Sequence, residues 1–195
     1  MNKTIVLILL LTIGFISCKN SEKEIDELGI AKKYYEILDK SNVSEIETLL
    51  TDSLLTKETE YEQKFSKKEY VEWLKWDSVF EPTYEILQIK QENKIVKAKI
   101  SKMDKRISFL HKEPIVINQI IRFDNNKIMT IETTEYVIFK DSIFVENRDG
   151  LVNWIDKNHP ELNGFIHDQT ESGGMKYLKA IELYKNKNNV LQHRI

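Results

Sequence analysis

The sequence predicts an α+β fold in which N-terminal helices pack on a curved antiparallel sheet, followed by a C-terminal helical extension. Apolar residues recur at helical spacing before Pro82 and again after residue 140, whereas they alternate between these limits. Short polar turns separate the alternating runs, which indicates an antiparallel meander rather than strands joined by crossover helices. The chain has 195 residues, 41% hydrophobic and 31% charged, a composition that suits one folded domain.

Three helices are predicted before Pro82. The first carries apolar residues at steps of three and four, namely Ile25, Leu28, Ala31, Tyr35 and Leu38. The second is expected to begin at Ser44 and the third at Ser66, because a glutamate follows each serine three residues later, as in a capping box. Residues 51–64, between these two helices, are polar and are predicted to form a loop.

Five strands are predicted next, at residues 83–91, 94–103, 106–111, 114–123 and 127–139. Asn93 and the Asn125-Asn126 pair fall between strands, where asparagine tolerates the positive φ of tight turns. A helix is then expected to begin near Asp149 and to end at His159-Pro160, because proline cannot continue it. A last helix is predicted after Gly173-Gly174.

Residues 1–17 are predicted to be a signal peptide, because Lys3 precedes an apolar run that is shorter than the about 20 residues needed to span a bilayer. The run ends in Phe15-Ile16-Ser17-Cys18, which resembles the lipobox of bacterial lipoproteins. The resemblance implies cleavage between Ser17 and Cys18, lipidation of Cys18, and a polar tether through residue 24. It also implies an extracytoplasmic protein held on a bacterial membrane by its lipid. By resemblance to the sorting signals of such lipoproteins, Lys19 rather than aspartate after the cysteine implies the outer membrane rather than the inner.

A second resemblance concerns the body of the chain. Tyr34-Tyr35-Glu36-Ile37-Leu38, the hydrophobic third helix, and Thr133-Thr134-Glu135-Tyr136 resemble the NTF2-like, or SnoaL-like (cystatin-like α+β), family. The resemblance covers residues 25–140, leaving residues 141–188 as a helical extension of the same domain and residues 189–195 as a frayed tail. It implies a cone whose concave sheet face closes on the helices around a pocket. Members include isomerases, dehydratases, binding proteins and structural modules, so the fold does not define a function.

The candidate pocket residues are polar side chains that interrupt apolar strand faces. Gln119 interrupts one such row, and Thr133 and Glu135 interrupt the row on the next strand. A buried polar group without a partner costs roughly 1–3 kcal/mol, so each must bond a neighbour, a water or a ligand. Trp73 is expected to line the pocket with them, and Glu135 to act as an acceptor or as a base with a raised pKa. The alternative is that the strands bend and these side chains reach solvent.

No catalytic set, metal site or cofactor motif is predicted. The four histidines (His111, His159, His167 and His193) lack metal-binding spacing, and the single cysteine excludes a disulfide framework and a cysteine-based zinc site. The formal charge of −2 gives no electrostatic basis for nucleic-acid binding.

Three functions therefore remain open. The protein could be a lipid-anchored module that binds a small apolar or amphipathic ligand. It could be a structural subunit that meets an envelope partner, or a second copy of itself, through an outer sheet face containing Val116 and Ile120. It could be an acid–base enzyme. A cavity above about 300 Å³ that contains Glu135 would favour binding or catalysis, and a nearby histidine would favour catalysis.

Overall fold

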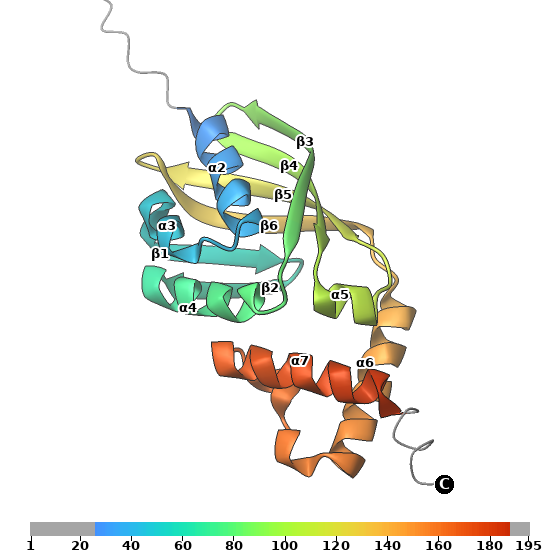
Figure 1. Ribbon diagram of the computed structural model, residues 1–195. Coiled ribbons are helices and arrows are strands. Elements are labelled where there is room, and N and C mark those ends of the chain that lie inside the picture. The colour runs from blue at the N-terminus through green and yellow to red at the C-terminus, as the bar shows by residue number, and fades with distance from the viewer. Residues whose placement is uncertain (1–25, 188–195) are drawn as a thin grey trace, which may run out of the picture.

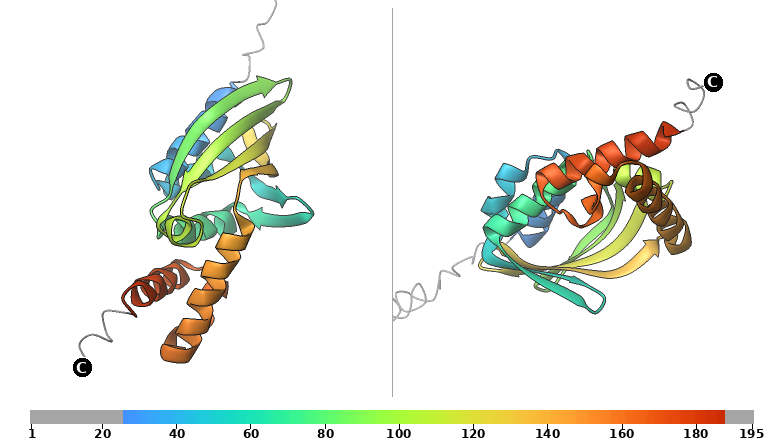
Figure 2. Two further views of the ribbon diagram at one scale, coloured as in Figure 1. Left: turned by 90° about the vertical axis from the view of Figure 1, so that its right-hand side faces the viewer. Right: turned by 90° about the horizontal axis from the view of Figure 1, so that it is seen from below.

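The computed structural model describes residues 26–187, so the predicted signal peptide, Cys18, its tether and the predicted tail lie outside the described part. One curved sheet has helices packed across its concave side (Figure 1; Figure 2, right). Its strands are β1 (Leu50–Glu58), β2 (Tyr61–Ser66), β3 (Thr83–Glu92), β4 (Ile95–Met103), β5 (Ile115–Asp124) and β6 (Lys127–Ile138). The α+β class is confirmed. Between residues 26 and 187, no helix combines the length and hydropathy that a membrane crossing requires.

The sheet order is β2-β1-β6-β5-β4-β3. Strands β3 to β6 form the predicted antiparallel meander, whereas β1 runs parallel to β6, a pairing that the sequence did not indicate. Asn93, Asn125 and Asn126 have φ values of 55°, 46° and 62°, the left-handed conformation expected of asparagine in these turns.

The β1–β2 hairpin corrects the prediction of a loop at residues 51–64. Its strands have few buried apolar positions, chiefly Leu50, Leu54 and Phe65, so they lack the alternation by which strands are recognised. β2 forms an edge of the sheet, where polar residues are common because one side of the strand meets water.

Of residues 106–111, predicted as a strand, residues 106–110 belong instead to helix α5 (Lys105–Leu110), and His111 is its C-cap. The Asp104 carboxylate accepts a hydrogen bond from the backbone N–H of Ile107 at 2.5 Å, which caps the N-terminus of this helix. Ile107 and Leu110 are buried at helical spacing. So short a segment fits the apolar spacing of a helix and of a strand equally well. The N-terminal cap therefore indicates a helix where the spacing alone does not.

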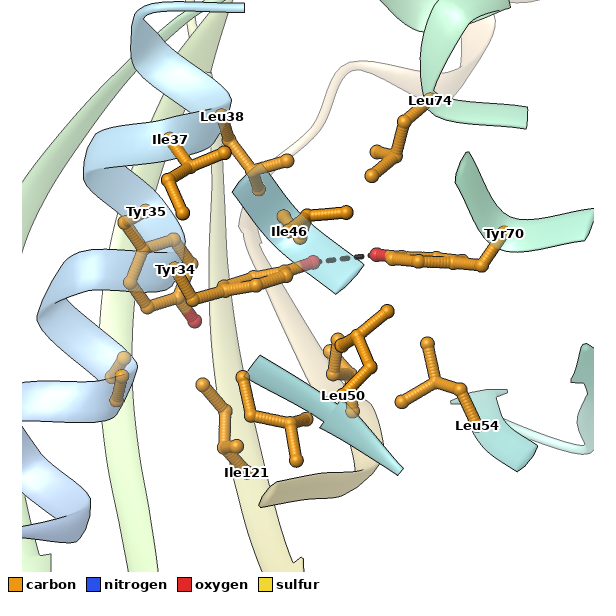
Figure 3. Packing of buried hydrophobic residues seen from close by; sticks show 14 of the residues in the cluster. Tyr34, Tyr35, Ile37, Leu38, Ile46, Leu50, Leu54, Tyr70, Leu74 and Ile121 are labelled. Carbon is orange, nitrogen blue, oxygen red and sulfur yellow. Dashed lines mark hydrogen bonds between the residues drawn. The ribbon is translucent and has the colours of Figure 1, made fainter. Parts of the chain in front are cut away.

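The helices before the meander are α2 (Glu27–Asp39), α3 (Val43–Ile46), which runs into the 3-10 turn η2 (Glu47–Leu49), and α4 (Lys67–Ser78). Ser66 and Glu69 form the predicted capping box of α4. The predicted capping box at Ser44 is absent, and α3 starts after Asn42 without a side-chain cap. These helices pack on the sheet around a first core, the cone core, in which the hydroxyl groups of Tyr34 and Tyr70 lie 2.6 Å apart (Figure 3). The cone core also includes Tyr35, Ile37, Leu38, Ile46, Leu50, Leu54, Leu74 and Ile121.

The C-terminal helices are α6 (Asp141–Asn158) and α7 (Glu171–Lys185), separated by the 3-10 turns η3 (Pro160–Leu162) and η4 (Phe165–His167). α6 begins before the predicted Asp149 but ends at His159-Pro160 as predicted. Thr170 caps α7, so Gly173 and Gly174 lie inside its first turn. These helices pack with the end of α4 and with α5 around a second core, the C-terminal core, which comprises Trp76, Phe80, Phe109, Leu110, Leu151, Ile155, Leu162, Phe165, Tyr177, Ala180 and Ile181.

Candidate functional site

A cavity of about 640 Å³ lies inside the cone, between the concave face of the sheet and helix α4. Its mouth is marked by the exposed residues Glu58, Tyr61 and Tyr136, and the Tyr136 hydroxyl donates a hydrogen bond to Glu58 at 2.5 Å. Pockets that hold small molecules typically measure about 300–1,000 Å³. The cavity therefore has the size of a small-molecule site.

Aromatic side chains form the wall of the cavity on the α4 side. Tyr70 and Trp73 stack with ring centroids 5.7 Å apart, and Phe65 of β2 lies 6.3 Å from Trp73. Ile117 and Ile131 of the sheet also line the cavity. This wall offers flat apolar contact area at low conformational cost, because aromatic rings have few rotatable bonds.

A chain of three polar side chains crosses the sheet side of the cavity. The Tyr35 hydroxyl donates to Gln119 Oε1 at 2.9 Å, and Gln119 Nε2 donates to Thr133 Oγ1 at 3.1 Å. Gln119 is thus hydrogen-bonded to neighbouring side chains on both sides of its amide, and its polar group does not need a ligand as a partner. Both Gln119 and Thr133 line the cavity.

A charged group lines another part of the cavity, here called its buried end because Asp77 is only 2% exposed; it consists of Asp77 and the half-buried Tyr84, Lys102 and Arg106. Lys102 Nζ donates to both carboxylate oxygens of Asp77, at 2.7 and 2.8 Å, and the Tyr84 hydroxyl donates at 3.2 Å. Burial alone would raise the pKa of Asp77, but the cations of Lys102 and Arg106 outweigh it and hold that pKa below its usual range. Burial and the Asp77 charge raise the pKa of Tyr84, so its phenol stays protonated at neutral pH.

Arg106 is held mainly by aromatic stacking. Its guanidinium carbon lies 4.8 Å from the ring centroid of Trp76 and 5.0 Å from that of Phe80. Its Nη2 atom is 3.4 Å from Asp104 Oδ2 and 3.7 Å from Asp77 Oδ1. The buried Nε atom has no hydrogen-bond acceptor among residues 26–187.

Of the predicted pocket residues, the structure brings Trp73, Gln119 and Thr133 together at the cavity. The placement of Glu135 in the cone is wrong. Gln119 pairs with Thr133 and Asn118 pairs with Glu135, so Thr134 is an extra residue in β6. Such a β-bulge shifts the alternation by one residue, which turns Glu135 to the outer face. There its carboxylate accepts a hydrogen bond from Asn118 Nδ2 at 2.6 Å.

The charged residues of the buried end were missed, although their pattern was visible. Asp77 follows Tyr70 and Leu74 at helical spacing, which places a carboxylate on the apolar face of α4. Lys102 continues the inward row of β4 that contains Val96, Ala98 and Ile100. A charged side chain on an apolar face needs a buried partner, and each of these residues is the other's partner.

The histidines within the described residues do not line the cavity. His111 is buried, where Nε2 accepts a hydrogen bond from the Lys140 backbone at 2.6 Å and Nδ1 donates to the Glu113 carbonyl at 2.7 Å. Both ring nitrogens thus hold the backbone, a structural role. Within residues 26–187, no group of three or more metal-binding side chains could hold an ion.

No protein-family model and no curated protein matches this chain. Among solved structures, it is similar to a protein from Kribbella flavida DSM 17836, with a TM-score of 0.50 and 8% identity over 63% of this chain and 93% of that chain. This likeness shows the fold alone. An uncharacterized cystatin fold protein from Novosphingobium aromaticivorans gives a TM-score of 0.49 and 14% identity, over 56% of this chain and 97% of that chain.

An NTF2-like protein of unknown function from Cytophaga hutchinsonii gives a TM-score of 0.47 and 9% identity, over 57% of this chain and 91% of that chain. Matching solved structures thus include proteins described as NTF2-like and as cystatin-fold. The class that the structure itself defines is an α+β cone with an interior cavity.

Proposed function

We propose that the protein is an extracytoplasmic lipoprotein, anchored through Cys18, that holds a small amphipathic molecule in the cone cavity. The observation that carries the binding role is the cavity of about 640 Å³, with an aromatic wall on one side and a few fixed polar groups. The anchor rests on the resemblance of residues 15–18 to a lipobox. Two or three acyl chains on that cysteine would hold the protein stably, whereas one chain binds only marginally.

An acid–base enzyme is less well supported by the same geometry. A general base works best when its pKa lies near the working pH, but Lys102 and Arg106 lower the pKa of Asp77 against the effect of burial. Glu135, the base suggested by the sequence, lies on the outer face. A binding role requires neither group to exchange a proton.

A structural role through the outer sheet face is also less well supported. The positions that alternate with the inward rows are largely polar there, namely Lys97, Lys99, Asn118 and Arg122. Ile120 lies among them, and Val116 is buried. Interfaces between permanent partners are usually more apolar than this face.

The binding role is tested with the full-length protein in lipid nanodiscs. Calorimetric titration with octanoate and octanamide, corrected for empty nanodiscs, is expected to show saturable binding of at least one probe. Trp73→Ala should weaken that binding, because Trp73 forms part of the aromatic wall. Trp154→Ala is the matched control, since Trp154 packs against the C-terminal core, as Trp73 also does, but does not line the cavity. Absence of saturable binding, or equal effects of the two variants, would contradict the proposal.

The anchor is tested by metabolic labelling with palmitate in a bacterial host. Label is expected in the wild-type protein and not in Cys18→Ala, and the wild-type protein should fractionate with the outer membrane. An unlabelled wild-type protein, or a Cys18→Ala protein with the same membrane distribution, would remove the basis for an extracytoplasmic location.

A further inference from the structure

We infer that the ligand carries a carboxylate on an apolar body, and that Arg106 binds this carboxylate at the buried end of the cavity. The inference rests on the proposed function, because it names the ligand class of the same site. The side chain concerned belongs to α5, the helix in the connection between β4 and β5.

The first step is the balance of charge at the buried end. Among the described residues that line it, Lys102 and Arg106 are cations and Asp77 is an anion. Asp104 is fully buried, with a side-chain exposure of 0%, and caps α5. With Asp104, which lies 3.4 Å from Arg106, the two cations and two anions of this group balance, so an anionic ligand group would be bound by hydrogen bonds to Arg106 rather than by a net positive charge.

The second step separates the two cations. Lys102 contacts both oxygens of Asp77 within 2.8 Å, so this pair is compensated internally. Arg106 lies farther from its carboxylates, at 3.4 and 3.7 Å, and its side chain keeps 19% of its exposure. Arg106 is thus the cation whose hydrogen-bonding capacity is least used, and a planar guanidinium fits a carboxylate with two parallel hydrogen bonds.

The third step is preorganisation. The rings of Trp76 and Phe80 both lie within about 5 Å of the guanidinium carbon, so packing against them restricts its orientation before a ligand enters. Fixing a long side chain in advance lowers the entropy that binding must otherwise remove. Trp73 and Ile117 line the same cavity and are available to an apolar body attached to the acid.

The test compares octanoate with octanamide, which have the same apolar chain and nearly the same shape but differ in charge. In the wild-type protein in nanodiscs at neutral pH, octanoate is expected to bind about tenfold more tightly, the effect of one charge-assisted contact. Arg106→Gln should remove this preference while octanamide binds as before. Lys105→Gln is the matched control, because Lys105 precedes Arg106 on α5 but is exposed, does not line the cavity and pairs with Glu81. It should leave the preference intact.

The outcomes distinguish the inference from the proposed function. Equal affinities of the wild-type protein for the two probes overturn the inference but leave a binding role standing. A preference that survives Arg106→Gln also overturns it. Failure of both probes to bind saturably overturns the proposed function itself. If circular dichroism shows that Arg106→Gln is unfolded, Arg106→Lys replaces it, and a preference that is unchanged in this variant overturns the role of the guanidinium.

Discussion

The two cores of the molecule are built differently. The cone core is interrupted by the Asp77–Lys102 ion pair and the Gln119–Thr133 hydrogen bond, and it leaves a cavity. The C-terminal core, as described in residues 26–187, is a cluster of aromatic and aliphatic side chains. Full packing favours stability, whereas polar groups and open volume are typical of binding sites. The comparison indicates that the C-terminal core contributes mainly to stability. The cone core is less stable than a fully packed core would be, because it contains the cavity and the polar groups of the site.

The largest expected effect comes from opening a void in the C-terminal core. Leu151 is fully buried, at 0% exposure, so Leu151→Ala should lower the free energy of unfolding by about 4 kcal/mol. Urea denaturation followed by circular dichroism measures this change. Octanoate affinity at temperatures where the variant is folded should stay at the wild-type value, and a loss below about 1 kcal/mol would contradict the comparison.

A slightly smaller loss of unfolding free energy is expected when the Asp77–Lys102 ion pair of the cone is broken. Asp77→Asn leaves Lys102 without its carboxylate, and removal of one partner of a buried ion pair typically costs about 3 kcal/mol or more. The same urea experiment checks it. The variant Lys75→Gln, which breaks an exposed pair with Glu72, is the control and should change stability by less than about 0.5 kcal/mol.

The pH dependence of that effect has a defined sign. Because the pKa of Asp77 is lower in the folded protein than in the unfolded chain, where it is about 3.9, the ion pair stabilises the fold above that pH. The stabilisation is lost as the pH falls through the folded pKa. The difference in unfolding free energy between wild type and Asp77→Asn should therefore shrink as the pH is lowered from neutral to below the unfolded pKa. A constant difference would show that Asp77 does not act through its charge.

A smaller effect is expected at the hydrogen bond between Tyr34 and Tyr70. Tyr34→Phe removes one hydroxyl of this buried pair and should cost about 1 kcal/mol. Tyr61→Phe is the matched control, since Tyr61 is 64% exposed and its hydroxyl loses only an exposed contact. Equal thermal shifts for both variants would show that the buried bond contributes nothing beyond burial of the ring.

The smallest effect is expected at Glu135. Since Glu135 lies on the outer face and bonds Asn118, Glu135→Gln should change stability by less than about 0.5 kcal/mol and leave probe binding unaltered. A loss of octanoate binding in this variant, measured by the same titration, would contradict this prediction and support the role of Glu135 as a pocket residue that the strand pattern suggested.

Periodicity predicted those elements in which one face is consistently apolar. The meander from β3 to β6 and the capping box of α4 follow directly from the residues. The β1–β2 hairpin did not, because its strands are polar and β1 pairs with β6, which lies far along the chain. Pairing between distant segments does not show in the spacing of apolar residues within either segment.

The candidate site was predicted in part for a related reason. Strand alternation located Gln119 and Thr133 correctly, but a single extra residue, Thr134, reversed the phase for Glu135. Bulges depend on the partner strand and cannot be counted from one strand alone. Asp77 and Lys102 could have been noticed in the sequence, because each places a charge on the apolar face of its element, α4 or β4. Only the fold shows that these two faces are in contact.

The parallel pairing of β1 with β6 joins segments that leave the ribosome far apart in time. Leu50 pairs with Ile128, about 80 residues later in synthesis, so the first hairpin must keep one open edge until nearly the whole sheet exists. Closing so long a loop is entropically costly and slows folding. Chaperones that shield exposed strand edges would therefore act on this chain chiefly before β6 is complete.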